Sequence, residues 1–401
     1  MKDLGSWINR DGKTVFLEKT VRTVPYGFLG VLFGVYLAQL GFNAFEIGVV
    51  LTLTVLSSAF YTFIVSFVAD RIGRRRTLVF FALTDFAAGS ALFLSTAWWA
   101  PVFAGIVGNM TVGAGEVGPF LSLEQAIVPR TCNPDRRTLA FSIYNLVGYG
   151  ASSLGALIAG VPQYFGYRPL FLAYMASGLL GALLYASLSE KVEIEHGHEG
   201  KKHPALSQKA RPVVLKLSAL FAVDAFGGGF IGQSILSYYF YTRFALDLST
   251  LGEIFFATQI VTALSFLVAA RIARKIGLLR TMVFTHIPSN VFLTAVAFAP
   301  TPFTAVFFLL CRHSLSQMDV PARQSYVMAI VDESDRTAAA GLTSSTRTVS
   351  SSISPSIAGY AIETIWIGIP LVAAGLLKLA YDLMIYVTFR KVKPPEEMHT
   401  N

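Results

Sequence analysis

Two similar stretches, ADRIGRRRTLVF at residues 69–80 and ARKIGLLRTMVF at residues 273–284, align without a gap and share seven identical positions. A second pair follows at a similar offset, because residues 137–160 and residues 336–359 both begin with Arg-Thr and end with Ala-Gly. One such match could arise by chance in an apolar sequence, but two at corresponding places indicate an internal duplication. The chain is therefore predicted to consist of two halves built on one plan.

Long apolar runs occupy most of the chain. Of its 401 residues, 54% are hydrophobic and only 14% are charged, which is too little charge to cover the surface of a soluble protein of this size. A helix needs about 20 largely apolar residues to cross a bilayer. The segments that meet this requirement are residues 16–40, 46–68, 77–96, 99–123, 138–160, 169–188, 213–240, 251–270, 281–299, 302–322, 338–362 and 367–389. We therefore expect an all-α membrane protein with twelve transmembrane helices.

The longest polar interruption, residues 189–211, falls between the sixth and seventh predicted spans. It divides the chain into an N-terminal six-helix bundle (residues 1–188), a cytoplasmic linker (residues 189–211) and a C-terminal six-helix bundle (residues 212–401). The remaining loops are too short to hold a soluble domain. Cys132 and Cys311 are too few for a disulfide framework.

Basic residues lie between alternate spans, and the predicted outer loops hold only Arg168 and Arg243. Because Lys and Arg are retained on the cytoplasmic side, both termini are expected to face the cytoplasm, in a multi-pass protein of the cell membrane. This distribution accounts for the formal net charge of +8, so no nucleic-acid partner is expected. The expected surroundings are the lipid bilayer, and the expected oligomeric state is a monomer.

The run ADRIGRRR at residues 69–76 resembles the loop motif of the major facilitator superfamily, whose usual form is Gly-x-Leu-x-Asp-Arg-x-Gly-Arg-Arg/Lys. Ser66 stands where that motif has its first Gly. The resemblance implies the fold of that family, in which two bundles rock to expose a central site to each side in turn. It also implies a cytoplasmic gate, in which a carboxylate meets the start of the eleventh span, where free N–H groups favour an anion. The gate residues are Asp70, Arg71, Gly73, Arg74 and Arg336. Binding of the basic run to anionic lipid is the alternative interpretation.

Two other signatures of the family are altered in this chain. In the fourth span the family commonly carries an Arg ahead of Gly-x-Gly, but Asn109 precedes the Gly-Ala-Gly of residues 113–115. In the fifth span, residues 155–160 read GALIAG instead of the antiporter motif Gly-Pro-x-x-Gly-Gly. The first change removes an arginine-dependent proton relay, and the second weakens the prediction of export by antiport.

Charged residues inside the predicted spans are the candidates for a site, because an ionisable side chain at mid-bilayer must face a cavity or a partner. Arg312 and Arg347 have no obvious partner on their own helices, and their forked guanidinium donors suit a carboxylate or phosphate. The predicted substrate-binding residues are Arg312, Arg347, Arg22, Asp224 and Lys378. Two structural alternatives stay open: Asp224 could form a fixed pair with either arginine, and Lys378 could pair with Asp382 four residues later on one helix.

Coupling to protons would need a carboxyl group that changes its protonation during the cycle. The candidates are Glu116 first, then Asp224, and also Asp382. Glu116 could instead close a gate or pair with Arg22. His286 and His313 are expected to form hydrogen bonds rather than to relay protons.

The favoured function is secondary active transport of a small organic solute, with coupling to protons. The mid-membrane arginines favour an anionic solute. Multidrug efflux by proton antiport and facilitated uniport are the alternatives within transport, and a non-transporting membrane sensor or scaffold is the alternative from another class. The sequence contains no His-Glu-x-x-His, no phosphate-binding loop and no Cys pairs, so neither an enzyme nor a metal or cofactor site is predicted.

Overall fold

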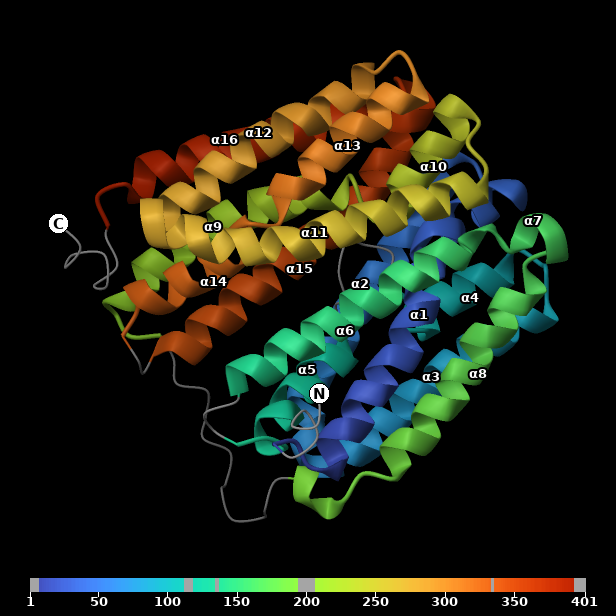
Figure 1. The fold of residues 1–401 in the computed structure, drawn as a ribbon, viewed down its shortest axis with the longest axis horizontal. Helices are drawn as coiled ribbons and strands as arrows, with labels where there is room; N and C mark the ends of the chain where they lie inside the picture. Colours follow the sequence, from blue (N-terminus) through green and yellow to red (C-terminus); the bar gives the residue numbers. More distant parts are fainter. Residues whose placement is uncertain (1–6, 112–117, 134–136, 194–205, 333–334, 393–401) are drawn as a thin grey trace. The chain divides into compact units, whose positions relative to one another are not determined.

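The computed structural model describes residues 7–111, 118–133, 137–193, 206–332 and 335–392, and the regular elements of this part are helices (Figure 1). The helices group into two compact units. Unit 1 comprises Met1–Gly197 and Gln233–Phe256, and unit 2 comprises His198–Gly232 and Ala257–Asn401. Residues 233–256 thus pack with the first unit, although they follow the predicted linker in the sequence.

Unit 1 is built around α1. Its helices are α1 (Arg10–Gln39), α2 (Ala44–Ile72), α3 (Arg74–Leu94), α4 (Trp99–Val107), α5 (Pro119–Ile127), α6 (Arg137–Leu157), α7 (Pro162–Phe165), α8 (Arg168–Ala186), α10 (Gln233–Phe244) and the start of α11 (Leu248–Ile276). Helix α1 packs against α6, α8 and α10, while α3 packs along α8. The start of α2 is fixed by a capping box, in which the Asn43 and Glu46 side chains each accept the other's backbone N–H.

Unit 2 has a comparable arrangement. It contains α9 (Ala210–Gly229), the rest of α11, α12 (Leu278–Phe298), α13 (Pro302–Ser316), α14 (Asp319–Ile330), α15 (Arg336–Thr364) and α16 (Ile369–Phe389). Helix α9 packs against α15 and α16, and α12 packs against α13, α14 and α16.

The duplicated loop has the same backbone geometry in both units. Gly73 joins α2 to α3 with φ of 105°, and Gly277 joins α11 to α12 with φ of 89°. Residues with a Cβ rarely adopt this region, so glycine suits both junctions. Each glycine also donates its N–H to the carbonyl four residues earlier, on Ala69 and Ala273 respectively. The sequence repeat therefore corresponds to a repeated helix junction.

Three predicted spans are each covered by two helices. Span 99–123 contains α4 and α5, which lie on either side of residues outside the described part of the chain. Span 213–240 contains α9 and α10, and span 302–322 contains α13 and the start of α14. The fourth and tenth spans, which occupy the same place in the two halves, are thus interrupted alike. Interrupted helices free backbone and side-chain groups that can serve a polar site.

Helices α1 and α6 approach closely through glycines. A Cβ added at Gly27 would lie 2.0 Å from the Ser152 carbonyl oxygen, and one added at Gly155 would lie 2.0 Å from the Val24 carbonyl oxygen. Any larger residue at either place would force the two backbones apart. Small residues of this kind are the usual means by which membrane helices reach close contact.

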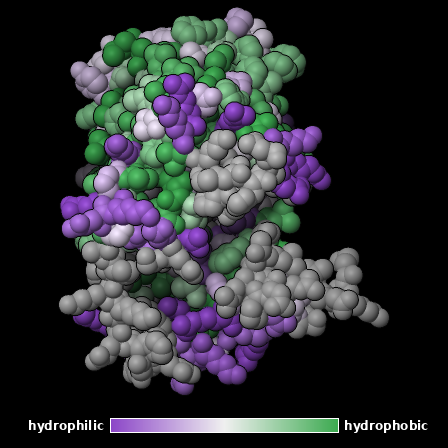
Figure 2. Space-filling view, turned by 90° about the vertical axis from the view of Figure 1, so that its left-hand side faces the viewer, coloured by the Kyte–Doolittle hydropathy of each residue, from purple (hydrophilic) through white to green (hydrophobic). Residues whose placement is uncertain are grey.

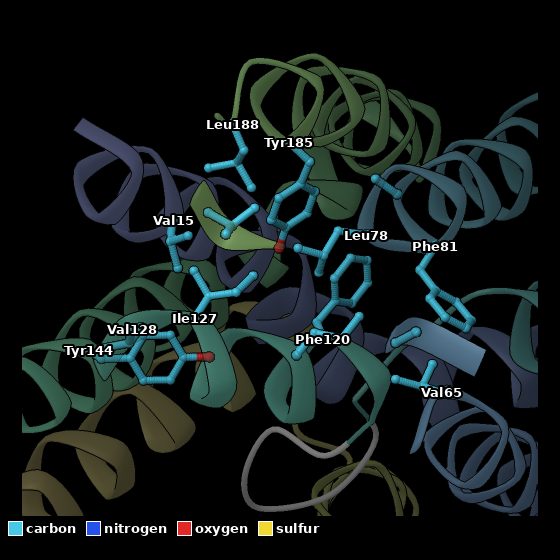
Figure 3. Packing of buried hydrophobic residues seen from close by; sticks show 14 of the residues in the cluster. Val15, Val65, Leu78, Phe81, Phe120, Ile127, Val128, Tyr144, Tyr185 and Leu188 are labelled. Carbon is cyan, nitrogen blue, oxygen red and sulfur yellow. The ribbon is translucent and has the colours of Figure 1, made fainter. Parts of the chain in front are cut away.

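Each unit has its own apolar core. In unit 1 the core contains residues from α1, α2, α3, α5, α6 and α8, including Leu78, Phe120, Tyr144 and Tyr185 (Figure 3). In unit 2 it contains Leu217, Phe221, Met282, Tyr326 and Tyr381, from α9, α12, α14 and α16.

Large apolar side chains also cover much of the outside (Figure 2). Phe303 is 80% exposed, and Phe63 and Val387 are also mostly exposed, which a soluble surface would not favour. Eight helical stretches in the described residues are long and apolar enough to cross a membrane. The chain is a multi-pass membrane protein, and the count of twelve spans stays a prediction.

Candidate functional site

Asp224 on α9 is the centre of a buried charge network in unit 2. Its Oδ1 accepts from Lys378 Nζ at 2.6 Å, and its Oδ2 accepts from Arg347 Nη1 at 2.7 Å and Arg323 Nη1 at 3.3 Å. The three cations come from α16, α15 and α14. One carboxylate therefore holds four helices of the unit together through charge-assisted hydrogen bonds.

Two further carboxylates complete this network. Asp319 accepts from Arg323 Nη1 at 2.7 Å, one turn away on α14. Asp382 accepts from Asn290 Nδ2 at 3.0 Å and lies 2.8 Å from His286 Nδ1. Because a carboxylate only accepts, His286 carries a hydrogen on Nδ1, while its Nε2 lies 3.8 Å from Asp224 Oδ1. The network thus brings together three aspartates, two arginines, one lysine and one histidine.

Arg347 differs from the other members of the network in its exposure. Its side chain is 28% exposed, whereas the side chains of Asp224 and Lys378 are 3% and 9% exposed. Arg347 is therefore the cation that a solute can reach most easily without disturbing the rest.

Arg312 on α13 is buried but lies outside this network. Its Nη1 contacts His313 Nε2 at 3.2 Å, and its Nε has no hydrogen-bond partner within the described chain. An arginine can only donate, so His313 Nε2 is the acceptor and His313 Nδ1 donates to Thr262 Oγ1 at 3.1 Å. In the part of the chain that the structure describes, no carboxylate forms an ion pair with Arg312. A buried guanidinium in this situation is suited to receive an anion.

Arg22 lies in unit 1, in a second buried cluster. Its Nε donates to both carboxylate oxygens of Glu18 at 3.1 Å, and its Nη2 donates to Glu124 Oε2 at 2.7 Å. Its guanidinium carbon also lies 4.2 Å from the centre of the Phe120 ring. The predicted partner, Glu116, lies outside the described residues.

Asp85 on α3 forms a third buried polar group, close to the previous one. Its oxygens accept from the Tyr26 hydroxyl at 3.0 Å, the Tyr174 hydroxyl at 3.2 Å, and the backbone N–H and side-chain Nδ2 of Asn109 at 2.9 and 3.2 Å. The family resemblance implies an arginine at the place of Asn109. Here Asn109 serves a carboxyl group of its own unit.

The repeated basic loop contacts the end of the first half. Glu193 accepts from the backbone N–H groups of Arg74 at 2.6 Å and Arg75 at 3.1 Å, at the start of α3. Gly73 suits this junction because of its φ of 105°, and a Cβ there would lie 2.9 Å from Glu193 Oε1. The anion at this helix start is therefore Glu193.

The other predicted gate residues are described in part. Arg71 is exposed in the last turn of α2, and Arg336 donates from Nε to the Met328 carbonyl oxygen at 3.1 Å. The side chain of Asp70 lies outside the described part, so its predicted contact with the eleventh span stays a prediction.

Two aspartates fasten the ends of the linker in the same manner. Asp11 accepts from the Ser189 N–H at 3.0 Å and from its hydroxyl at 2.5 Å, and Asp335 accepts from the Ser207 N–H at 2.9 Å and from its hydroxyl at 2.7 Å. The hydrogen bonds from the Ser207 N–H and hydroxyl lower the pKa of the Asp335 carboxyl below its usual value.

Sequence reasoning found part of these clusters. Arg347 forms an ion pair with Asp224, which was one of the open alternatives. Lys378 also contacts Asp224, whereas Asp382 contacts His286 and Asn290. The local pair of Lys378 with Asp382 is therefore not observed. Arg323, Glu18 and Glu124 were missed. Arg323 was counted among the cytoplasmic bases, and Glu18 was not singled out. Each has an opposite charge four residues away on its helix, Asp319 and Arg22 respectively, which was an available signal.

A family model described as Major Facilitator Superfamily matches residues 20–316 of the chain. In sequence, the chain is 25% identical to the uncharacterized membrane protein YJR124C of Saccharomyces cerevisiae, over 95% of this chain and 94% of the yeast protein.

Solved structures of transporters share the fold. The nucleoside transporter NupG matches with a TM-score of 0.74 and 15% identity, covering 95% of this chain and 100% of NupG. The human organic anion transporter MFSD10 matches with a TM-score of 0.65 and 14% identity, covering 94% of this chain and 99% of that protein. A bacterial homologue of the human lysosomal transporter Spinster matches with a TM-score of 0.71 and 16% identity, covering 95% and 97%. At these identities the likeness establishes the fold alone.

Proposed function

Because the chain belongs to the Major Facilitator Superfamily, we propose that it is a secondary active transporter that moves a small organic anion across a membrane by alternating access. The family is one of transporters, so the chain is not expected to be an enzyme. The observation that carries the choice of an anion is Arg312, a buried guanidinium with an unsatisfied Nε and no ion pair to a carboxylate among the described residues.

An unpaired buried cation carries a large desolvation penalty. An anionic solute would remove that penalty by supplying the acceptor, and a carboxylate or phosphate matches the forked donors of arginine. Neutral solutes such as sugars would leave the charge uncompensated. MFSD10, which shares the fold, is described as an organic anion transporter, and this description agrees with the choice of an anion.

The network around Asp224 supplies the response to binding in this proposal. Arg347, its most exposed cation, can leave Asp224 for the solute, because Lys378 and Arg323 remain on the carboxylate. Exchange of one anionic partner for another costs less than creating an unpaired charge. Arg22, in unit 1, is a further predicted contact of the solute.

The finer features of the proposal concern coupling and placement. We place both termini in the cytoplasm and the chain in the cell membrane as a monomer, on the distribution of basic residues. Coupling to protons is proposed, with Asp224, Asp382 and Glu116 as the sequence-derived candidates. The hydrogen-bond contact of Asp382 with His286 supports its candidacy, because a proton taken up by this carboxyl group would lie next to a second titratable group.

The test is a transport screen with the full chain in proteoliposomes. Radiolabelled monocarboxylates, phosphate esters, nucleosides and neutral sugars are offered with and without a pH gradient. We expect uptake of an anion, loss of that uptake in Arg312→Gln, and partial uptake in Arg312→Lys, which keeps the charge but not the fork.

The matched control is Arg280→Gln, which removes an exposed arginine of the same unit and should leave uptake unchanged. Transport of neutral solutes alone, or normal kinetics in both Arg312→Gln and Arg347→Gln at normal protein abundance, would refute the anion site. Equal uptake with and without the pH gradient would identify facilitated uniport. Accumulation of the solute inside the liposomes, driven by an outward flux of protons, would identify proton antiport, the mechanism of the efflux alternative.

A further inference from the structure

Two buried glutamates of unit 1 face each other across a tyrosine hydroxyl. Glu18 lies on α1 and Glu124 on α5, and their relative exposures are 1% and 0%. The hydroxyl of Tyr185, from α8, lies 2.5 Å from Glu18 Oε2 and 2.7 Å from Glu124 Oε1. Figure 3 shows this hydroxyl, and that of Tyr144, directed into the interior of the cluster.

The Tyr185 hydroxyl makes two contacts with carboxyl oxygens but has one hydrogen to donate. Tyr185 has one hydroxyl hydrogen and can donate it to one glutamate only. The other glutamate, at hydrogen-bond distance from the same oxygen, must then donate a hydrogen to Tyr185, which a carboxylate does not possess. Both contacts are satisfied when one of the two glutamates carries a proton.

The remaining contacts hold the pair without supplying that hydrogen. Arg22 donates to both glutamates, and Tyr144 on α6 donates to Glu124 Oε2 at 2.5 Å while accepting from Lys19 Nζ at 3.0 Å. Lys19 also lies 4.2 Å from the centre of the Tyr144 ring.

The next titratable group is Asp85 on α3, which is reached through the Tyr26 hydroxyl. Tyr26 itself lies beside Arg22, whose guanidinium carbon is 5.8 Å from its ring. Among the residues that the structure describes, the charged and titratable groups around the pair, on the helices packed against it, are Lys19, Arg22, Tyr26, Asp85, Tyr144 and Tyr185.

We infer that Glu18 and Glu124 share one exchangeable proton across Tyr185, and that this pair is a proton-binding site of the transport cycle besides the sequence-derived candidates; the second part rests on the transport function proposed above. Proton uptake transfers a proton from a hydronium ion to a carboxylate oxygen, so that one O–H bond forms as another breaks, and release returns the proton to water. After release, the second negative charge lies beside Arg22 and within reach of Lys19, so neither state leaves a buried charge without a neighbour of opposite sign. Such a site can exist with and without its proton.

The first experiment detects the proton directly and needs no solute. Infrared difference spectra of the full chain in lipid are recorded between buffers of different pH, in H₂O and D₂O. We expect a carboxylic acid C=O band that is pH-dependent and shifts in D₂O, and that is lost in Glu18→Gln and in Glu124→Gln. Tyr185→Phe should keep the band at a shifted frequency, because the acid loses the acceptor of its hydrogen bond.

Two carboxyl variants serve as matched controls for the spectra. Glu46→Gln alters an exposed glutamate whose capping role glutamine can fill, and Asp85→Asn alters the neighbouring buried carboxyl. Neither should remove the band. A band that persists in both Glu18→Gln and Glu124→Gln, or that disappears in Asp85→Asn, would overturn the assignment. If a glutamine variant fails to fold, an unshifted band in Tyr185→Phe would also overturn the assignment.

The second experiment tests coupling with an anion identified in the transport screen. Glu18→Gln and Glu124→Gln should keep exchange of that anion across the membrane and lose its pH-driven accumulation, down to the level of protein-free liposomes. Retained pH-driven accumulation would overturn the coupling role and leave the proton site intact. Conversely, failure of the Arg312 predictions would refute the anion site without changing the infrared result, so the two proposals fail separately.

Discussion

Asp224 shows how much one side chain can support in a membrane protein. It accepts hydrogen bonds from three cations on three other helices of its unit. Asp224→Asn keeps the shape but removes the charge that compensates them. Because a broken buried ion pair leaves an unpaired charge, we expect a loss of about 3 kcal/mol in the free energy of unfolding. Thermal and denaturant unfolding of the purified protein in detergent measure this loss.

A double variant provides the control for this substitution. Asp224→Asn combined with Lys378→Met removes one charge of each sign and should recover part of the lost stability, because contacting residues are energetically coupled. Equal stability of Asp224→Asn and the natural protein would mean that the network does not hold the helices together.

The linker contact of Asp335 should respond to pH. The pKa of Asp335 is lowered by the hydrogen bonds from Ser207, so its ionised form is the one that the fold favours. The contact therefore contributes fully above the ordinary aspartate pKa of about 3.9 and is lost as the pH falls through the lowered folded value. We expect a spin label at Gln208→Cys, with both natural cysteines replaced, to be restrained at neutral pH and mobile in acid.

Asp335→Asn should mobilise the same label already at neutral pH. The neighbouring Asp332 pairs with Lys209 in an exposed bridge of 3.4 Å, so Asp332→Asn should change little. A label that is equally mobile in the natural chain and in Asp335→Asn would contradict the proposed fastening.

At the scale of single residues, the sequence predicted which charges are unusual but not which partners they meet. Arg312, Arg347, Asp224 and Lys378 were recognisable because each is a charge in an apolar span. Their partners depend on which helices pack together, and one sequence does not determine that. The pair of Glu18 and Glu124 was not predicted from the sequence. Glu18 lies near the helix start, where a hydropathy pattern indicates an exposed charge, whereas in the structure its side chain is buried.

Among the elements, the contact of α1 with α6 allows a sharp prediction. Gly27→Ala and Gly155→Ala each place a methyl group against a backbone carbonyl of the opposite helix. Overpacking of this kind costs about 1–3 kcal/mol, and the measurement is the free energy of unfolding. Gly150 lies on the same α6 with open space around its Cβ position, so Gly150→Ala should be neutral or slightly stabilising. Similar losses at all three positions would argue against the close contact.

Helix boundaries were the least predictable elements. A hydropathy window averages over about 20 residues, so it does not register a short interruption inside an apolar run. Helix α9 ends at Gly229, the last of three consecutive glycines, and the break before α14 lies at Gln317 and Met318, ahead of Pro321. The glycines and the proline were visible signals, whereas the polar contacts that the breaks accommodate were not.

The two units alternate along the sequence, because residues 233–256 belong to unit 1 while the residues on either side of them belong to unit 2. The Ser234 hydroxyl donates to the Gly30 carbonyl oxygen at 2.9 Å, and Gly34 lies against the Ser234 carbonyl oxygen. A fragment of residues 1–197 lacks these contacts of α1. We expect it to be unstable alone and to be recovered as a soluble-in-detergent complex when residues 198–401 are co-expressed.

Size-exclusion chromatography of the tagged fragment, with and without its complement, measures this dependence. The control is a second fragment from which residues 233–256 are deleted, because it lacks α10 but keeps α9 of unit 2, and it should abolish the rescue. A monodisperse fragment of residues 1–197 on its own would show that unit 1 does not need the later segment.

The glycine contact between α1 and α6 has a practical consequence for following the motions of this protein. Two helices whose backbones touch without intervening side chains cannot slide or tilt past one another by small repacking, so their separation is a constant of the molecule. Spin labels on Leu17 and Leu154, which are exposed on these two helices, would then serve as an internal ruler. Any pair of labels whose distance changes while this one stays fixed reports genuine rearrangement elsewhere.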